Sequence, residues 1–570
     1  MLKDCLEVFK NIYEQYGDKL ITDDYTLVEG SYVLVKKDNS YEVLEVSKKD
    51  NDTSNKLYQY FVQRDYLSKL IDMNKPIDGK KVVHSNNYLT FFIKKENINK
   101  TKLTSEIIDK YYEILLNPTI KYKDKNEKKS MYEKAERIYG KVNENQLISN
   151  KDWIKSNVFN LVNEVKSDKN YLKVFFEEDI DIYSKESNKY ILPNIYNNTD
   201  FNLNIELKTY GLPNDNMGLN SKKPYLEQKT RKNTIPYLIN EEEVLLQKKF
   251  FDYLMNKANK GKRLIYVDDK IYALEIGDKL DKRFNGYFLR IQKGKEVEIQ
   301  DFDTIVNLNH NITKFNIDMI IHIDYSKNKQ NLEYKLTEDI NYIENTINDV
   351  FFNKYLKINY FVDTKEIKLN DSKLKYILIT HREELFTWFY KGNIKNIKKS
   401  LPKWSLDIIK NSILNEYKLK ATEQFNLRHS LLKYFNGGNN MADMLKEIKD
   451  SLRIKINQKE TTIIQNDEEY YFAIGQIASY LISLNKSANK SHSLLNPIIN
   501  SKSEEKLVNE INKLFKKYNY AIKKDNKRFN NLYSMILGYK SSSKINDDLL
   551  IAGYLNSNLI YEKMEDKDNE

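Results

Sequence analysis

Cysteine, proline and glycine are scarce in this sequence. A single cysteine, Cys5, occurs among 570 residues, which excludes an intramolecular disulfide and any zinc site built from several cysteines. Only 8 prolines and 16 glycines are present, so long flexible or proline-rich linkers are excluded as well. The chain is too long for a single hydrophobic core, and we expect roughly three to four domains joined by short connections.

Long hydrophobic runs are missing too. The N-terminus reads M-L-K-D-C-L-E-V-F-K and lacks the uninterrupted apolar segment of a signal peptide. No apolar run approaches the roughly 20 residues that cross a membrane. With 31% charged residues and a mean hydropathy of −0.69, the chain is expected to be soluble and cytoplasmic, with no membrane partner.

The short motifs of common enzymes are absent. The sequence contains no G-x-x-x-x-G-K-[ST], no H-E-x-x-H, no G-x-S-x-G and no G-x-G-x-x-G. The six histidines are scattered; His322 and Asp324 lie on one face of a predicted strand at 317–323. A metal pair is one interpretation of these two side chains, and a strand end without a ligand is the favoured one. We expect no metal, no cofactor and no enzymatic activity.

Basic residues outnumber acidic residues, 93 to 82, which gives a net charge of +11. This balance suits a polyanionic partner such as nucleic acid. The chain is also rich in lysine, asparagine, isoleucine and tyrosine, as expected from an A/T-rich genome. The distribution of charge along the chain is therefore more informative than its total.

The hydrophobic pattern predicts an α+β multidomain protein, with mixed α/β structure in the N-terminal and central parts and an all-helical bundle at the C-terminus. Predicted strands lie at 26–35, 41–46, 88–93, 190–195, 201–208, 263–267, 271–275, 286–292, 296–299 and 317–323, and residues 100–190 look mainly helical. The predicted domains are an N-terminal α+β region (1–125), a central β-rich region (126–335), a helical connector (336–440) and the C-terminal bundle (441–570).

The segment at 210–232, Y-G-L-P-N-D-N-M-G-L-N-S-K-K-P-Y-L-E-Q-K-T-R-K, is predicted to be a loop because of its glycines and prolines. Amide side chains followed by cations are the groups that reading base edges and binding phosphates require. An ordinary ordered loop with a solvated basic rim is the alternative. The candidates for reading a DNA motif are Asn214, Asn216 and Asn220, and those for binding phosphate are Lys222, Lys223, Lys229, Arg231 and Lys232.

Two further basic segments are candidate contacts for nucleic acid. One precedes the predicted strand at 88–93 and contains Lys75, Lys80, Lys81, His84, Asn86 and Asn87. The other carries five lysines in thirteen residues without an acid, Lys391, Lys395, Lys398, Lys399 and Lys403, which suits a face that follows phosphates. The alternatives are a surface loop before a core strand and a solvated charged helix.

One pattern is similar to a nuclease. Asp200, Glu206 and Lys208 have the spacing of a restriction-type nuclease core, in which the acids hold Mg²⁺ and the lysine helps to position water. Such triplets arise often by chance in a chain rich in Asp, Glu and Lys. A metal-dependent nuclease is therefore kept as an alternative, and a structural interaction scaffold as a second one.

Three long blocks carry a family resemblance. They are L-S-K-L-I-D-M-N-K-P-I-D-G-K-K-V-V-H-S-N-N-Y-L-T-F-F-I-K-K at 67–95, the loop segment at 210–232, and E-E-E-V-L-L-Q-K-K-F-F-D-Y-L-M at 241–255. The chain resembles, from residue 1 to about 570, the large subunit of the type I-B CRISPR Cascade complex of low-GC Firmicutes. Some members of that family carry a cysteine-rich zinc-binding insert, which a chain with one cysteine lacks.

The resemblance implies a role in an RNA-guided antiviral complex. A large subunit of this kind reads the protospacer-adjacent motif on double-stranded DNA, supports binding of the guide RNA 5′ handle, and helps the R-loop to form by steadying the displaced strand. It recruits the helicase-nuclease and does not cut DNA itself. The implied partners are guide RNA, target DNA, the backbone and handle-binding subunits, the small subunit and the helicase-nuclease.

The sequence before the C-terminal bundle suggests an internal translation start. Gly437 and Gly438 stand shortly before Met441, and their codons can form a ribosome-binding site upstream of that methionine. The resemblance adds that relatives make the small subunit from within this gene. A product beginning at Met441 would carry 20 basic and 18 acidic residues. A simple domain linker is the alternative interpretation of the two glycines.

Overall fold

A computed structural model describes residues 2–47, 52–71, 73, 75–99, 102–122, 125–196, 202–206, 208–213, 238–294, 296–326, 330, 332–437, 440–460, 462–485 and 492–562. The chain forms two compact units. The first unit comprises residues 1–276 and 286–304, and the second comprises 277–285 and 305–570. The predicted boundaries at 125, 335 and 440 all fall inside these units, so the four-domain division stays a prediction.

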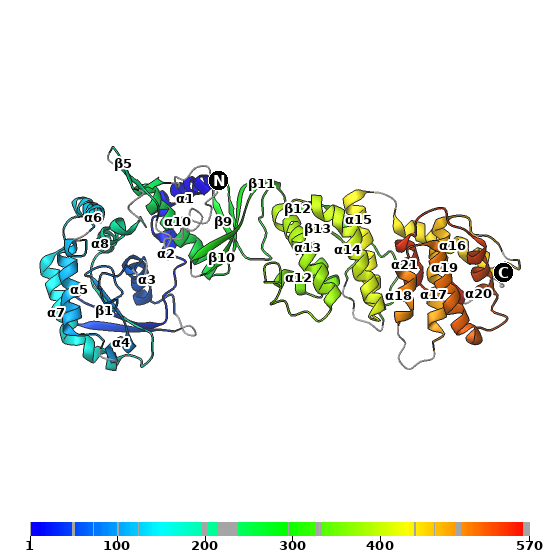
Figure 1. The fold of residues 1–570 in the computed structure, drawn as a ribbon, viewed down its shortest axis with the longest axis horizontal. Helices are drawn as coiled ribbons and strands as arrows, with labels where there is room; N and C mark the ends of the chain where they lie inside the picture. Colours follow the sequence, from blue (N-terminus) through cyan, green and yellow to red (C-terminus); the bar gives the residue numbers. More distant parts are fainter. Residues whose placement is uncertain are drawn as a thin grey trace. The chain divides into compact units, whose positions relative to one another are not determined.

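The predicted fold class is confirmed. Mixed α/β structure with several sheets extends to β13 (Leu336–Asp339), and helices follow from there to the C-terminal part (Figure 1). None of the described helices is long and apolar enough to pass through a membrane.

The first unit is organised around a four-stranded sheet with the order β2-β1-β4-β3. The strands are β1 (Gly30–Val35), β2 (Tyr41–Val46), β3 (Thr90–Lys94) and β4 (Tyr171–Phe176). β4 runs parallel to β1 and antiparallel to β3. The predicted boundary at 125 would therefore separate the central strand β4 from its neighbours.

The sequence did not predict β4, because residues 100–190 are otherwise helical and Lys173 interrupts its apolar run. In the structure Lys173 is buried and its ammonium lies 2.5 Å from the carboxylate of Asp65 on α3 (Lys56–Ser68). Asp65 also accepts a hydrogen bond from the Tyr25 hydroxyl. A charged side chain is tolerated in the core only when it is paired in this way. Asp65, the partner of Lys173, lies 108 residues away in the sequence.

Helices surround this sheet and extend the core of the first unit. Their bounds are α1 Leu2–Tyr16, α2 Lys19–Thr22, α4 Lys95–Asn99, α5 Ser105–Leu116, α6 Asn126–Tyr139, α7 Glu144–Glu164, α8 Ile180–Ile191 and α10 Glu241–Asn259. α10 begins with a capping box, in which Asn240 and Glu243 satisfy each other's backbone N–H groups. Cys5 on α1 lies in this core, and burial raises the pKa of its thiol to about 11.

Two further sheets, of four and three strands, follow β4 in the chain. One has the order β11-β10-β8-β9, built from β8 (Leu264–Val267), β9 (Ile271–Leu274), β10 (Phe284–Lys293) and β11 (Val297–Leu308). The other is β5-β6-β7, built from β5 (Leu203–Ile205), β6 (Lys208–Gly211) and β7 (Ile239–Asn240). The predicted strands at 263–267, 271–275, 286–292 and 296–299 are confirmed within a few residues, and β11 is much longer than predicted.

Three predicted strands are wrong. Residues 190–195 form the end of α8 and a 3₁₀ turn (Leu192–Asn194), because their apolar side chains continue the buried helix face that includes Tyr183. The segment predicted at 201–208 is not one strand, because Leu203–Ile205 pairs antiparallel with the strand that begins at Lys208. Residues 317–323 form no strand, because the amide of Asn426 binds both the backbone N–H and the C=O of Ile321, at 2.8 and 3.0 Å, in place of a neighbouring strand.

After the end of β11, the second unit contains an antiparallel pair of strands, β12 (Asn311–Asn316) and β13, and continues as helices. Their bounds are α11 Ile340–Val350, α12 Tyr355–Ile358, α13 Ser372–Lys391, α14 Lys395–Leu414, α15 Lys418–Asn436, α16 Met441–Asn457, α17 Asp467–Ser483, α18 Asn496–Ile499, α19 Glu504–Tyr518, α20 Lys527–Gly538 and α21 Asp547–Leu555. Figure 1 shows α16 to α21 as a bundle coloured yellow to red. Ile409 on α14 and Phe425 on α15 belong to the same hydrophobic core as this bundle.

Two glycines allow α17 and α21 to approach closely. A Cβ atom added at Gly475 would clash with the carbonyl oxygen of Leu550, and one added at Gly553 would clash with that of Phe472. Both obstacles are backbone atoms, so no side-chain movement relieves them. These two of the 16 glycines therefore set the distance between the two helices.

The first turn of α21 fastens the bundle to α14 and α15. Arg428 on α15 binds the carboxylate of Asp548 through two parallel contacts of 3.0 Å, and it also reaches the Ser405 hydroxyl on α14. Lys410 on α14 lies 3.0 Å from Asp547. The His429 imidazole, 3.5 Å away, and the Arg428 charge hold the pKa of Asp548 well below its usual range, although burial opposes this shift.

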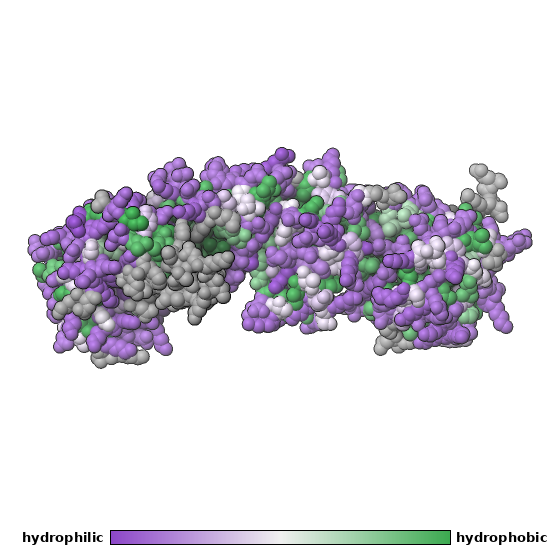
Figure 2. Space-filling model, turned by 45° about the horizontal axis from the view of Figure 1, so that its top comes forward, coloured by the Kyte–Doolittle hydropathy of each residue, from purple (hydrophilic) through white to green (hydrophobic). Residues whose placement is uncertain are grey.

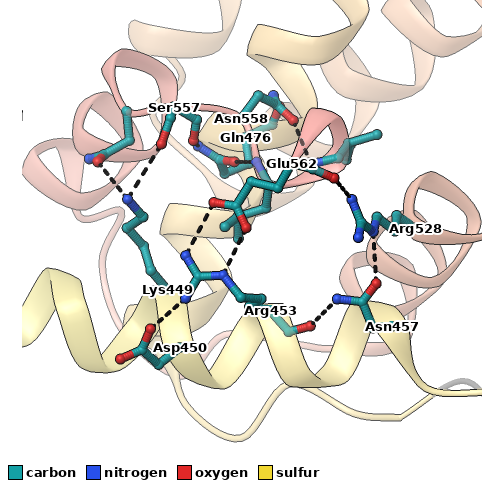
Figure 3. Close-up of polar contacts among 12 residues, drawn as sticks. Lys449, Asp450, Arg453, Asn457, Gln476, Arg528, Ser557, Asn558 and Glu562 are labelled. Carbon is teal, nitrogen blue, oxygen red and sulfur yellow. Dashed lines mark hydrogen bonds and ion pairs between the residues drawn. The ribbon is translucent and has the colours of Figure 1, made fainter. Parts of the chain in front are cut away.

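The C-terminal residues close the bundle onto its first helix. Figure 3 shows Arg453 on α16 directed at the Glu562 carboxylate, with contacts of 2.7 and 3.1 Å. Arg528 on α20 donates to the Glu562 carbonyl, and Lys449 on α16 contacts Ser557 at 3.5 Å (Figure 3). The amide of Gln476 accepts from the Leu559 N–H at 2.8 Å. The segment after α21 is thus bound to α16, α17 and α20 together.

The helix crossing generates a testable prediction. Gly553→Ala should lower the free energy of unfolding by about 1–3 kcal/mol, because the added methyl meets backbone on α17. Chemical denaturation followed by circular dichroism measures the change. Gly538→Ala, at the end of α20, is the matched control, because nothing lies within 4 Å of its added Cβ. Equal stability of the two variants would contradict the proposed contact.

Candidate nucleic-acid interface

The loop predicted to read DNA is only partly within the described residues. The described part ends with β6 and Pro213, whose backbone bridges to Tyr196. A Cβ at Gly211, the last residue of β6, would clash with the ring of Tyr196, so this position favours glycine. The candidate residues Asn214, Asn216, Asn220, Lys222, Lys223, Lys229, Arg231 and Lys232 lie outside the described residues. Their roles stay predictions.

The amides at 86–87 are occupied inside the fold. Asn86 is 2% exposed and donates to the carbonyls of Leu67 and Lys69, at 2.9 and 3.0 Å. Asn87 is fully buried, donates to the Ser68 hydroxyl and accepts from the Leu89 N–H. These contacts give both amides a structural role in shaping the loop, and neither side chain faces solvent where a base could reach it.

The remaining candidates of this loop divide by exposure. His84 is buried between the Tyr171 hydroxyl and the Lys81 carbonyl, and burial lowers the pKa of its imidazole, which favours the neutral form. Lys75 is half-buried. Lys80 and Lys81 are exposed and are the two cations of this loop that a phosphate can reach.

The lysine-rich segment at 391–403 places its cations on one helix face. Lys395, Lys399 and Lys403 follow one another at intervals of four along α14, and Lys398 lies beside them. All four are exposed, while Trp404 anchors the opposite face with 1% exposure. Lys391 is half-buried at the end of α13. The exposed four form a continuous basic face, which we call the α14 lysine face.

A second basic surface was not predicted from the sequence. The segment 502–528 carries nine basic and four acidic residues, a net charge of +5, whereas the rest of 441–570 sums to −3. Because the net charge of the whole bundle is close to zero, it gave no indication of this basic segment. It covers α19 and the start of α20, where acids Glu504 and Glu505 open α19 and lysines Lys516 and Lys517 close it.

A groove runs between α19 and α20, with a volume of about 810 Å³. We call it the α19–α20 groove; it is lined by Ser503, Glu505, Lys506, Asn509, Glu510, Asn512, Lys513, Phe515, Lys516, Tyr533 and Leu537. Three of these residues are lysines, and Lys513 is paired with Glu510 at 2.8 Å. The remaining lysines, Lys506 and Lys516, are the cations most available to an anionic strand.

Aromatic rings form part of the groove wall. The rings of Phe515 and Tyr533 stack with centroids 4.7 Å apart, and Tyr533 stacks in turn on the buried Phe529 at 5.5 Å. Phe515 and Tyr533 are both half-buried, so each keeps part of its ring accessible. Rings that offer a face beside lysines are what sequence-tolerant binding of single strands uses, since bases stack on the rings and phosphates meet the cations.

Glu206 and Lys208 do not have the arrangement that the nuclease alternative requires. Ile205 pairs with Lys208 across the β5–β6 hairpin, so Glu206 occupies the turn, with a left-handed backbone (φ 56°), instead of the strand that carries Lys208. Lys208 is exposed and contacts Glu242 at 3.2 Å. Asp200 lies outside the described residues.

A metal pair at His322 and Asp324 also lacks support. Both residues lie in the irregular segment after β12 and are exposed, and Asp324 binds the backbone N–H of Ser326 at 2.9 Å. Among the residues that the structure describes, no three His, Cys, Asp or Glu side chains cluster as metal ligands.

The visible surface is mainly hydrophilic, which suits polar binding partners (Figure 2). Apart from the atoms drawn in grey, the face shown in Figure 2 is mainly hydrophilic, and its hydrophobic residues form small separate spots. The α14 lysine face and the α19–α20 groove both belong to the second unit.

The groove yields a second prediction. Tyr533→Leu should weaken binding of a labelled oligothymidine about tenfold, because stacking contributes about 1–3 kcal/mol per base. Lys506→Gln with Lys516→Gln should reduce the salt dependence of binding, by about 0.7 in the logarithmic slope for each lost phosphate contact. Fluorescence anisotropy over a range of salt concentrations measures both effects. The control is Lys446→Gln, an exposed lysine on α16 outside the groove; if it weakens binding as much as the groove variants, the assignment fails.

Comparison with protein-family models, with curated proteins and with solved structures finds no match to this chain. The family resemblance therefore depends on the three sequence blocks alone.

Proposed function

We propose that this chain is the large subunit of a type I-B CRISPR Cascade complex, an RNA-guided antiviral surveillance assembly. The observation that carries the nucleic-acid part of this proposal is the α19–α20 groove, where stacked, partly accessible rings lie beside lysines. The resemblance of the three long blocks supplies the kind of complex. The α14 lysine face adds a second surface suited to a phosphate backbone.

The proposed mechanism is binding without cleavage. Lysines supply salt-dependent affinity for nucleic acid. Amides of the 210–232 loop read a short motif on double-stranded DNA, and base pairing between guide RNA and target supplies the remaining specificity. The α19–α20 groove suits the displaced strand, since that strand is single and its bases are free to stack. Other surfaces would contact the guide RNA 5′ handle, the neighbouring subunits and the helicase-nuclease.

The internal start at Met441 is part of the proposal. Met441 is the first residue of α16, and Gly437, with φ 65°, ends α15 four residues earlier. The segment that follows α21 binds α16 through Arg453 and Lys449, so a product beginning at Met441 keeps the contacts that close the bundle. It loses Arg428 and Lys410, the partners of Asp548 and Asp547. The short product would therefore expose two acids that the full chain covers.

A pull-down from cells carrying the native operon, with a tag on the C-terminus, tests the proposal. We expect a discrete small RNA together with a protein fragment whose mass corresponds to a start at Met441. Intact mass spectrometry and sequencing of the extracted nucleic acid provide the readout. Synonymous recoding of Gly437 and Gly438 should abolish the fragment and leave the full chain. Recovery of the full chain alone, without a discrete RNA, would refute the family assignment.

Motif reading by the 210–232 loop is tested separately. Asn214→Ala with Asn216→Ala should reduce the preference for duplexes that contain the motif over duplexes that lack it, because two base-reading amides are lost. Affinity for the motif-lacking duplex should change little, since phosphate contacts remain. Competition binding by the assembled complex gives this ratio. A wild-type ratio in the double variant would remove these residues from the reading role.

A further inference from the structure

The first unit contains two adjoining cavities. The smaller one, about 230 Å³, lies among the end of α3, α8, α10 and the start of β11. The larger one, about 580 Å³, lies among α1, α8 and α10. They share the lining residues Asn188, Ile191, Lys248 and Lys249. Together they reach the size of ordinary small-molecule sites, which are about 300–1,000 Å³.

Three lysines converge on one tyrosine ring in the smaller cavity. The ammonium groups of Lys69, Lys248 and Lys249 lie 4.9, 5.4 and 5.0 Å from the centroid of the Tyr66 ring. Asp252 contacts Lys248 at 2.5 Å and Lys69 at 3.9 Å, and Asp18 contacts Lys249 at 2.5 Å. Lys69 thus has the loosest pairing of the three.

The side chains of Lys248 and Lys249 are mostly buried, whereas 39% of the Lys69 side chain is exposed. Desolvation lowers the pKa of Lys69 and of Lys249, and the charge of Lys248 beside each of them acts in the same direction. A further anion in the cavity would favour the charged form of both lysines. The smaller cavity is lined by these three lysines and by two acids, Asp252 and Glu296, and this excess of cations suits a compact anionic group such as a phosphate.

Uncommitted polar groups face the same space. The hydroxyl of Ser187 and the amides of Asn188 and Gln247 line the cavities and make no hydrogen bond within the described part of the chain. Ser187 and Gln247 are 2% and 6% exposed. Asn188 is half-buried, and a ligand in the cavities could replace water as the hydrogen-bond partner of all three side chains.

The larger cavity is lined by more acids than the smaller one. Leu6, Tyr13 and Leu246 give it apolar walls, while its acids are Glu7, Glu14, Asp18, Glu242 and Glu243. Lys3 and Lys10 also line this cavity and pair with Glu243 and Glu14, at 3.5 and 3.8 Å, which leaves only a small excess of carboxylates to disfavour a second or third phosphate. The carboxylates also offer acceptors to the exocyclic amino group of a nucleobase, in the same way that Asp and Glu accept from cytosine.

We propose that the paired cavities bind a nucleoside monophosphate unit, with the phosphate among Lys69, Lys248 and Lys249 and the nucleoside between α1, α8 and α10. Asn188 and Gln247 hydrogen-bond the nucleoside, and Ser187 donates to the phosphate. The unit comes either from a free nucleotide or from the end of an RNA strand. This site is independent of the nucleic-acid surfaces of the second unit.

Isothermal titration calorimetry on the full chain tests the site, with AMP, adenosine, ATP and inorganic phosphate as probes. AMP should bind more tightly than adenosine, phosphate or ATP. Lys69→Gln should weaken AMP roughly tenfold or more, since it removes a charge-assisted contact, and Asp252 keeps Lys248 and the Tyr66 hydroxyl as partners. Asn188→Asp is a second variant; it adds a carboxylate without changing side-chain size and should weaken AMP more than adenosine.

The matched control is Lys270→Gln, an exposed lysine in the turn between β8 and β9. It should bind AMP like the wild type. A short RNA with a 5′-phosphate, compared with its 5′-hydroxyl form, distinguishes a strand end from a free nucleotide. If the phosphorylated RNA alone binds and Lys69→Gln abolishes it, the site takes a strand end. The proposal is refuted if no probe binds at millimolar concentration, or if AMP binds equally to the wild type and both cavity variants.

Discussion

The second unit depends on one close contact, the crossing of α17 and α21 at Gly475 and Gly553. Because the two backbones touch there, the first turn of α21 lies where Arg428 can bind Asp548, and the residues that follow α21 lie where Arg453 can bind Glu562. The first contact joins the bundle to α14 and α15, and the second closes the bundle on α16. A residue with a side chain at either glycine would separate the helices and disturb both.

The hydrophobic pattern predicted the helices and strands that are determined by residues close together in the sequence. The predicted strands at 26–35 and 41–46 correspond to β1 and β2, and the predicted bundle at 441–570 contains α17, on which Tyr470, Ile474, Ile477 and Leu481 are buried at helical spacing. The elements that were missed or wrongly predicted depend on contacts with residues far away in the sequence. β4 was missed because Lys173 is neutralised by Asp65, and residues 317–323 were misjudged because Asn426 takes the place of a strand. A window of sequence contains neither partner.

The candidate site also has parts that the sequence predicted and parts that it did not. The spacing of the lysines on α14 was visible in the sequence, and the structure places four of them on one exposed face. Amides beside cations at 86–87 were a poor guide, because asparagine serves backbone hydrogen bonds as readily as it serves bases. The α19–α20 groove escaped notice because its rings come from two helices and its charge is offset by acids elsewhere in the bundle.

The buried state of Cys5 has a practical consequence. Its thiol lies in the core of the first unit, and the raised pKa keeps it protonated at neutral pH. Thiol reagents react with the accessible thiolate, so the folded chain has no reactive background thiol of its own. A cysteine introduced at an exposed position would therefore be modified selectively by a fluorophore or a spin label. Distances between surfaces in solution, including the separation of the two units, can be measured without first removing a native cysteine.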